Sequence, residues 1–99
     1  MIIVMGTVRI APEGISAALP AMARMVAASN AEDGCLLYAY SQDLVDPGLV
    51  RISEHWTYRE ALKAHFATPH MAEWRKVIPT LGISDRNLML YEANDGEPV

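Results

Sequence analysis

The chain has 99 residues, which is enough for one domain with a single core and too few for a catalytic domain joined to a separate cofactor-binding domain. Hydrophobic residues make up 52% of the sequence and charged residues 20%, a composition typical of a folded domain. A formal net charge of -4 without any run of like charges argues against nucleic acid as a partner. We expect one domain over residues 1–99, with residues 93–99 as a frayed polar tail.

Cysteine usage and the first residues indicate the compartment. Cys35 is the single cysteine, so the chain forms no internal disulfide and offers no thiolate pair for a metal site. This is typical of a reducing compartment, and we expect a cytoplasmic protein. The apolar opening, Met1–Met5, lacks the basic stretch with which a signal peptide starts, and it is far shorter than the roughly 20 apolar residues that cross a membrane. The sequence therefore predicts neither a signal peptide nor a membrane span.

The first part of the chain predicts a strand, a helix and a second strand. Residues 2–10 are rich in β-branched side chains and stop at Ala-Pro-Glu-Gly, which is typical of a buried strand. Between residues 15 and 30, apolar side chains recur at helical spacing, at Ile15, Leu19, Met22 and Val26. After a turn at 32–34, residues 35–42 have the length and aromatic content of a strand.

The middle of the chain predicts a hairpin. Asp46-Pro47-Gly48 favours a tight turn, because proline presets one backbone dihedral and glycine accepts a positive one. This turn joins residues 35–42 to a third strand at 49–56. Alternation places Val50, Ile52, Glu54 and Trp56 on one face of that strand, and Leu49, Arg51, Ser53 and His55 on the other.

The last part predicts a broken helix and a fourth strand. Thr57 is a candidate N-cap, with Glu60 completing a capping box, for a helix that runs through residue 66. Thr68-Pro69 restarts the helix, because threonine caps and proline fits the first helical position, and apolar spacing continues it to residue 79. Residues 83–92 predict the last strand.

The element order is strand, helix, strand, strand, helix, strand. This order predicts an α+β fold of the ferredoxin-like βαββαβ type, an antiparallel sheet with its helices on one face. All four strands carry apolar side chains on both faces, so the helix-free face needs a cover. We expect a homodimer in which two sheets pack face to face.

Three segments resemble one known family in their order and spacing. They are Gly34–Tyr38, the strand end Ser53–Trp56 and the run Glu60–His70, which supply Glu-x-Trp, then Glu-Ala, then Ala-His-x-x-Thr-Pro-His. Over nearly its whole length the chain is similar to the antibiotic biosynthesis monooxygenase family. The resemblance implies a dimeric α+β barrel with an active cavity between each sheet and its own helices.

The resemblance also implies an activity, namely cofactor-independent oxidation of a phenol, hydroquinone or related polycyclic aromatic with O2. This chemistry needs an apolar pocket and a base that forms the phenolate, because the anion transfers an electron to oxygen more readily. The expected partners are a small aromatic substrate, O2 and a second copy of the chain. Two alternatives remain open: an isomerase of a small hydroxy-carbonyl compound on the same scaffold, and a non-catalytic small-molecule-binding dimer.

His65 is the first-choice base, because the resemblance places it near the cavity and imidazole titrates near neutral pH. His70 and Glu54 are the candidates to assist it. On an unbroken helix, histidines five residues apart diverge by about 140°, but the break at Thr68-Pro69 changes that angle. Structural roles are the alternative: packing at the helix break for His65, and a bond to a backbone carbonyl for His70.

Glu54 shares a strand face with apolar side chains, where a carboxylate must be paired, hydrogen-bonded or raised in pKa. It either orients a histidine or forms a salt bridge with one of three arginines, Arg51, Arg59 and Arg86.

Four aromatic side chains are candidates to hold a planar substrate, since edge-to-face and offset contacts orient rings. They are Trp56, Phe66, Trp74 and either Tyr38 or Tyr40, of which Tyr38 is the first choice. Core packing explains the same residues equally well.

Two other residues are not candidates for catalysis. His55 faces away from Trp56, toward the expected dimer interface, and Cys35 has no basic neighbour in sequence to lower its thiol pKa.

Haem-degrading relatives use Asn, Trp and an iron-ligating His where this chain has Thr7, His65 and Arg75. We therefore expect no metal and no cofactor.

Overall fold

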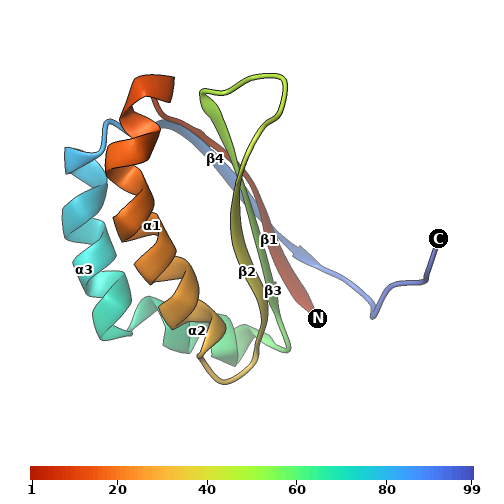
Figure 1. Cartoon of the computed structure of the whole chain (residues 1–99). Coiled ribbons are helices and arrows are strands. Elements are labelled where there is room, and N and C mark those ends of the chain that lie inside the picture. The colour runs from red at the N-terminus through yellow and green to blue at the C-terminus, as the bar shows by residue number, and fades with distance from the viewer.

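The computed structural model describes all 99 residues, which form four strands and three α-helices (Figure 1). They are β1 (Ile2–Arg9), α1 (Ile15–Asn30), β2 (Cys35–Gln42), β3 (Leu49–Trp56), α2 (Arg59–Phe66), α3 (Pro69–Val77) and β4 (Ser84–Glu92). Short 3-10 turns at Pro12–Gly14 and Ile78–Thr80 precede α1 and follow α3. None of the helices has the length and apolar character needed to span a membrane.

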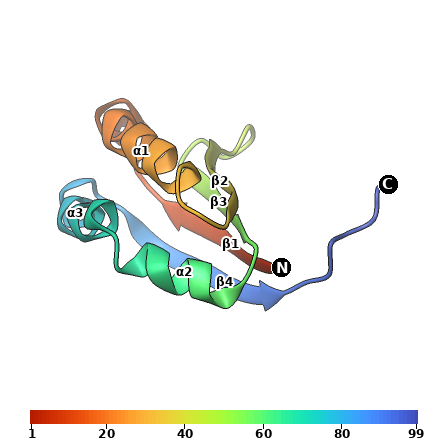
Figure 2. The same ribbon diagram turned by 90° about the horizontal axis from the view of Figure 1, so that it is seen from below.

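The four strands form one antiparallel sheet in the order β2-β3-β1-β4. All three α-helices lie on one face of this sheet (Figures 1 and 2). This is the ferredoxin-like α+β fold that the element order predicted. The predicted hairpin of β2 and β3 is confirmed with the predicted bounds. In its turn, the backbone N–H of Leu49 donates to the carbonyl of Asp46 at 3.0 Å.

The predicted N-cap at Thr57 is wrong. Helix α2 begins at Arg59 after an extended Tyr58, and no side chain caps it. Thr57 is engaged elsewhere, because its backbone N–H donates to the carbonyl of Gly34 at 2.9 Å and its hydroxyl points to the same oxygen at 3.4 Å. Thr57 therefore ties the start of α2 to the turn that precedes β2.

The predicted helix break at Thr68-Pro69 is confirmed. The hydroxyl of Thr68 accepts from the backbone N–H of Met71 at 3.3 Å and donates to the carbonyl of His65 at 2.7 Å. Pro69 is the first residue of α3, where its missing N–H leaves no helical bond unmade. The hydroxyl of Thr68 thus joins the end of one helix to the start of the next.

The turn before β2 packs directly on α2 through Gly34, which has a φ of +80°. A Cβ at this position would lie 2.6 Å from the Cβ of Ala61 and 2.8 Å from the hydroxyl of Thr57. Only glycine permits both this backbone conformation and this contact. The close approach brings the turn, and with it Glu32, against the helices.

The core lies between the sheet and the helices. The buried side chains of β3 are Val50, Ile52, Glu54 and Trp56, the face predicted from alternation. They pack with buried hydrophobic residues of the other elements, including Ile2, Val8, Ala18, Met22, Met25, Tyr38, Leu62 and Trp74.

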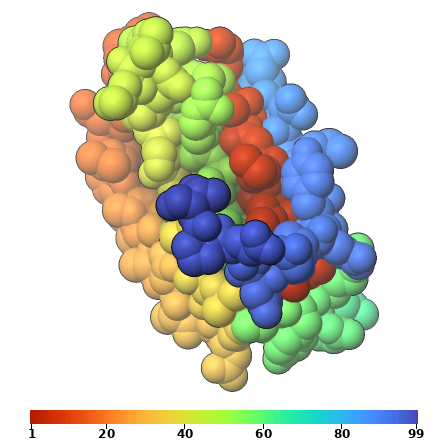
Figure 3. Space-filling view, turned by 90° about the vertical axis from the view of Figure 1, so that its right-hand side faces the viewer, coloured from red at the N-terminus to blue at the C-terminus, as the bar shows by residue number.

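The opposite face of the sheet carries exposed apolar side chains from three strands. Met5 is 51% exposed, Leu37 38%, Met89 56% and Tyr91 49%. Their cross-strand register places them on the side away from the helices, together with His55. Figure 3 shows this side of the molecule, with the C-terminal tail in front of it. The face-to-face dimer stays a prediction, and this is the surface that it would use.

Candidate active site

A cavity of about 500 Å³ lies between the inner face of the sheet and the helices. Its lining is mostly hydrophobic, with 12 apolar residues among 18. Apolar walls come from side chains such as Met22, Ile52, Phe66, Met71, Trp74 and Leu88. Polar groups come from Tyr38, Tyr40, Glu54, His65, Arg75 and Arg86, among others. A mostly apolar cavity with a few polar groups is typical of a small-molecule site.

His65 reaches the cavity wall from the last turn of α2 and is only 1% exposed. Its ring packs against two aromatic rings, at 4.9 Å from Trp56 and 5.4 Å from Tyr38 between ring centroids. Its Nδ1 lies 2.6 Å from Oε2 of Glu32. Packing and the hydrogen bond together fix the orientation of the imidazole.

The two ring nitrogens of His65 have different surroundings. A carboxylate only accepts hydrogen bonds, so the contact with Glu32 assigns the proton of the neutral ring to Nδ1 and the lone pair to Nε2. Nε2 has no hydrogen-bond partner in the chain, yet it is not fully enclosed, since Ser29 Oγ is the one enclosed side-chain polar atom without a partner. Burial lowers the pKa of His65, and Glu32 partly opposes this. Nε2 is therefore free to accept a proton.

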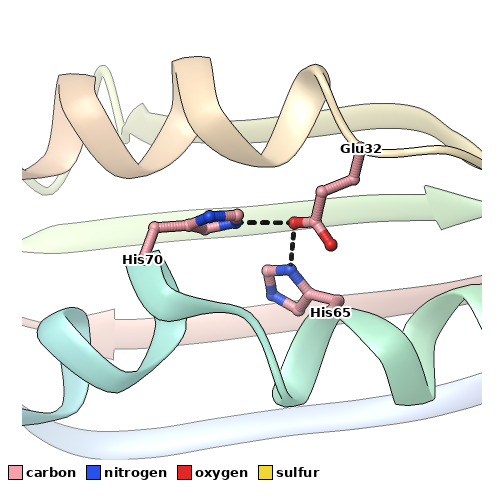
Figure 4. A group of neighbouring side chains, drawn as sticks. All are labelled: Glu32, His65 and His70. Atoms are coloured by element: carbon pink, nitrogen blue, oxygen red, sulfur yellow. Dashed lines mark hydrogen bonds and ion pairs between the residues drawn. The ribbon is translucent and has the colours of Figure 1, made fainter.

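The same carboxylate oxygen binds a second histidine (Figure 4). Nε2 of His70, at the start of α3, lies 2.8 Å from Oε2 of Glu32, and the centroids of the two imidazoles are 6.0 Å apart. The helix break turns the rings toward one point, as its position in the sequence suggested. His70 is 26% exposed and lies outside the main cavity, in a smaller groove between α1 and α3. It contacts a carboxylate and not the backbone carbonyl of the structural alternative.

Two imidazoles and a carboxylate are also a donor set that transition metals use. Donor atoms bound to one ion at about 2.1 Å lie roughly 3.0 to 3.4 Å from one another. The separations at Glu32, 2.6 and 2.8 Å, are shorter and correspond to hydrogen bonds. The cluster is thus arranged around shared protons.

Glu54 forms neither of the contacts that its sequence position suggested. It bonds to no histidine and to no arginine, because Arg51 and Arg59 pair with Asp43 and Glu92. Its Oε1 instead accepts from the indole Nε1–H of Trp56 at 3.1 Å. Glu54 is 7% exposed and lines the cavity. Burial raises the pKa of Glu54, against smaller opposing effects of Trp56 and Arg86.

Two tyrosines beside Glu54 share a hydrogen bond. The hydroxyls of Tyr38 and Tyr40 lie 2.9 Å apart, and Tyr38 is directly opposite Glu54 in the β2–β3 register. Burial raises the pKa of Tyr40 to about 12 and that of Tyr38 further. Both phenols are therefore protonated near neutral pH and available as hydrogen-bond donors.

The structure brings most of the predicted residues to one place. Tyr38, Phe66 and Trp74 line the cavity together with His65 and Glu54. Trp56 does not, because it is fully buried behind Glu54.

Sequence reasoning missed Glu32, which lies 33 residues before His65. The sequence predicted only a turn for its segment. No local pattern marks such a residue; its position two residues before Gly34, in a turn that packs on α2, becomes visible only in the fold.

Comparison with known proteins agrees with this architecture. The family model for antibiotic biosynthesis monooxygenases matches residues 1–77. A solved structure from Deinococcus radiodurans, assigned to the same family, has a TM-score of 0.90 and 31% identity and covers 100% of this chain and 98% of its own. A further structure, described as an antibiotic biosynthesis monooxygenase, has a TM-score of 0.83 and 32% identity over 95% of this chain and 99% of its own.

More distant relatives extend the comparison. Rv0793 of Mycobacterium tuberculosis has a TM-score of 0.84 at 23% identity over 98% of each chain, which shows a shared fold. The Synechocystis protein sll1783 is 25% identical over 91 residues, and this chain spans 62% of that relative's length. The family match covers most of the chain and includes the motif residues around His65. The chain belongs to the antibiotic biosynthesis monooxygenase family.

Proposed function

We propose that the protein is a cofactor-independent monooxygenase that oxidises a phenol, hydroquinone or related polycyclic aromatic with O2. One observation carries the proposal: His65 stands at the wall of a mostly apolar cavity, with Nδ1 bound to Glu32 and Nε2 free. Family membership supports oxygenase chemistry. A cavity of about 500 Å³ is large enough for a small polycyclic aromatic.

The first step is a proton transfer. Nε2 of His65 takes the proton of the substrate hydroxyl, and the imidazolium that forms faces the Glu32 carboxylate at 2.6 Å. The charge-assisted hydrogen bond stabilises this cation inside a site that excludes bulk water. His70 donates to the same oxygen, so it holds the carboxylate in place and is a positioning residue.

The second step uses oxygen directly. The phenolate gives one electron to O2, and the two radicals combine at a ring carbon to form a peroxide. His65 returns its proton to the peroxide, and the hydroperoxide then loses water to leave a carbonyl. Overall, a phenol and O2 give a quinone and water, so the substrate supplies all the electrons and no external reductant is needed.

The apolar walls serve this chemistry by holding the ring. Phe66, Trp74 and Tyr40 line the cavity, and the rings of Trp74 and Tyr40 lie 6.1 Å apart between centroids, so the aromatic groups of the lining are close enough to contact one planar substrate. An apolar cavity also admits O2 and excludes water from the radical pair.

We also propose that the protein is a homodimer that covers the exposed face of the sheet. Met5 and Met89 are cross-strand partners on this face, and each is more than half exposed. Sedimentation velocity at micromolar concentration should give a dimer, and Met89→Glu should give a monomer, since a charge would be buried on association. A monomeric wild type would contradict this part of the proposal.

Oxygen uptake tests the activity. Metal-stripped protein is supplied with a panel of hydroquinones and naphthols, next to a protein-free blank for autoxidation. Uptake should exceed the blank and fall at least tenfold, a loss of about 1.4 kcal/mol of transition-state stabilisation, in His65→Ala. Lys63→Gln, at an exposed position of the same helix α2, is the control and should retain activity. No uptake with any substrate would favour the isomerase or the binding dimer instead.

A further inference from the structure

Glu54 is a buried carboxyl group that takes no part in the proposed proton transfer at His65. It lies on the inner face of β3, opposite Tyr38, and forms no ion pair. Trp56 occupies Oε1, whereas Oε2 has no partner in the chain and is not sealed in the core. One oxygen is thus anchored, and the other is left for a molecule in the cavity.

The surroundings of Glu54 disfavour a negative charge. The titratable and charged groups near it are Cys35, Tyr38 and Tyr40 from β2, Arg86 from β4 and Glu32 from the turn before β2, and His65 from α2 lines the same cavity. Burial raises the pKa of Glu54 and the charge of Glu32 adds to this, while Trp56 and Arg86 act in the opposite direction. The neutral tyrosines give no compensating charge.

We propose that Glu54 acts as a neutral carboxylic acid that donates a hydrogen bond from Oε2 to a carbonyl oxygen of the substrate. The preferred substrates are then aromatic hydroxy ketones and hydroxyquinones, which carry an ionisable hydroxyl for His65 and a carbonyl for Glu54. The inference rests on the proposed function, because it assigns His65 to the hydroxyl.

The chemistry explains why these two groups belong together. When His65 removes the hydroxyl proton, the negative charge delocalises through the ring onto the conjugated carbonyl oxygen. An O–H donor at that oxygen binds the anion more strongly than the neutral substrate, which lowers the barrier to ionisation. A carboxylic acid kept neutral by an apolar site is a known way to supply such a donor. The largely apolar lining strengthens the bond.

Binding of a matched pair of ligands tests the inference without turnover. The probes are 6-acetyl-2-naphthol and 6-ethyl-2-naphthol, which are similar in size and carry the same hydroxyl, whereas only the first has a carbonyl oxygen. Affinities are measured under anaerobic conditions by quenching of tryptophan fluorescence. The variants are Glu54→Gln, which keeps a neutral donor, and Glu54→Leu, which has similar volume and none. Circular dichroism and melting curves monitor their folding.

We expect the wild type to bind the acetyl compound about tenfold more tightly than the ethyl compound. Glu54→Gln should keep most of this preference, and Glu54→Leu should lose it. The inference is overturned if the wild type shows no preference, if Glu54→Leu retains it, or if the Gln variant loses as much as the Leu variant.

Infrared spectroscopy supplies a second measurement if Glu54→Leu fails to fold. The carbonyl stretch of the bound acetyl compound should lie at lower frequency in the wild type than in apolar solvent, and an unshifted stretch would overturn the inference. Because neither measurement involves oxygen, the role of Glu54 and the monooxygenase activity are tested independently. Carbonyl preference without oxygen uptake removes only the monooxygenase, whereas uptake without preference removes only the role of Glu54.

Discussion

Replacing Glu32 by Gln removes the charge that faces His65 and keeps the shape of the side chain. In the wild type, one oxygen of Glu32 lies 2.6 Å from Nδ1 of His65 and 2.8 Å from Nε2 of His70. Glutamine still accepts a hydrogen bond, but it offers no charge to an imidazolium. Since Glu32 is the group that raises the pKa of His65 against burial, Glu32→Gln should lower that pKa further.

The loss of activity follows from the same geometry. With charge centres about 4 Å apart and an effective dielectric constant of about 20, the imidazolium and carboxylate attract by about 4 kcal/mol. The amide oxygen of glutamine restores about 1 kcal/mol through its hydrogen bond. The remaining 3 kcal/mol or so predicts a fall of roughly 100-fold in kcat/KM.

Oxygen-uptake kinetics measure the fall, and NMR titration of the imidazole protons measures the pKa. The chain has 3 histidines, so the third, His55 on the far face of the sheet, is a control in the same spectra and should be unaffected. A kcat/KM within about threefold of wild type, together with an unchanged His65 pKa, would refute the role of the carboxylate.

Three further predictions follow from the same structure. His70→Ala should lower kcat/KM by about tenfold, because it frees the Glu32 carboxylate; a change confined to KM would contradict a positioning role. Folding lowers the pKa of His65, so as the pH falls the unfolded chain takes up this proton before the folded chain does. The free energy of unfolding, measured by denaturant melts, should therefore decrease as the pH drops below 6.5, the ordinary pKa of histidine, and it should decrease less steeply in His65→Gln. Gly34→Ala should destabilise the fold by about 2 to 4 kcal/mol, because the new Cβ meets Ala61 at a positive φ. In the matched Gly14→Ala, where the nearest atom is 3.7 Å away, the melting temperature should hardly change.

The strands were predictable because the residues at their ends favour a turn whatever the rest of the fold does. Asp46-Pro47-Gly48 can hardly continue a strand, so it determined the inner ends of β2 and β3. Alternation then placed Glu54 and Trp56 on the buried face. The cap at Thr57 was not predictable, since its backbone and hydroxyl groups bind Gly34, which reaches it only through the fold.

The site was predictable only in part, for a related reason. Motif spacing and the helix break pointed to His65 and His70, and the structure brings both to one oxygen. The sequence could not identify that oxygen as belonging to Glu32, because the contact depends on how a turn packs against two helices. It placed Glu54 on the correct face but not beside its partner, since the choice between an indole and an arginine depends on side-chain conformation. The catalytic roles of these residues stay predictions.

The predicted base and part of the cavity wall lie on different elements of the fold. Glu32, His65 and His70 lie on a turn and on two helix ends, whereas Tyr40, Glu54 and Leu88 project from strands of the sheet. A substitution at Leu88 can therefore change which molecule fits, whereas Tyr38 and Trp56, which also lie on strands, pack on the His65 ring and help to hold it in place. The strand positions that line the cavity without packing on the imidazole are therefore the natural targets for changing which molecule the cavity binds.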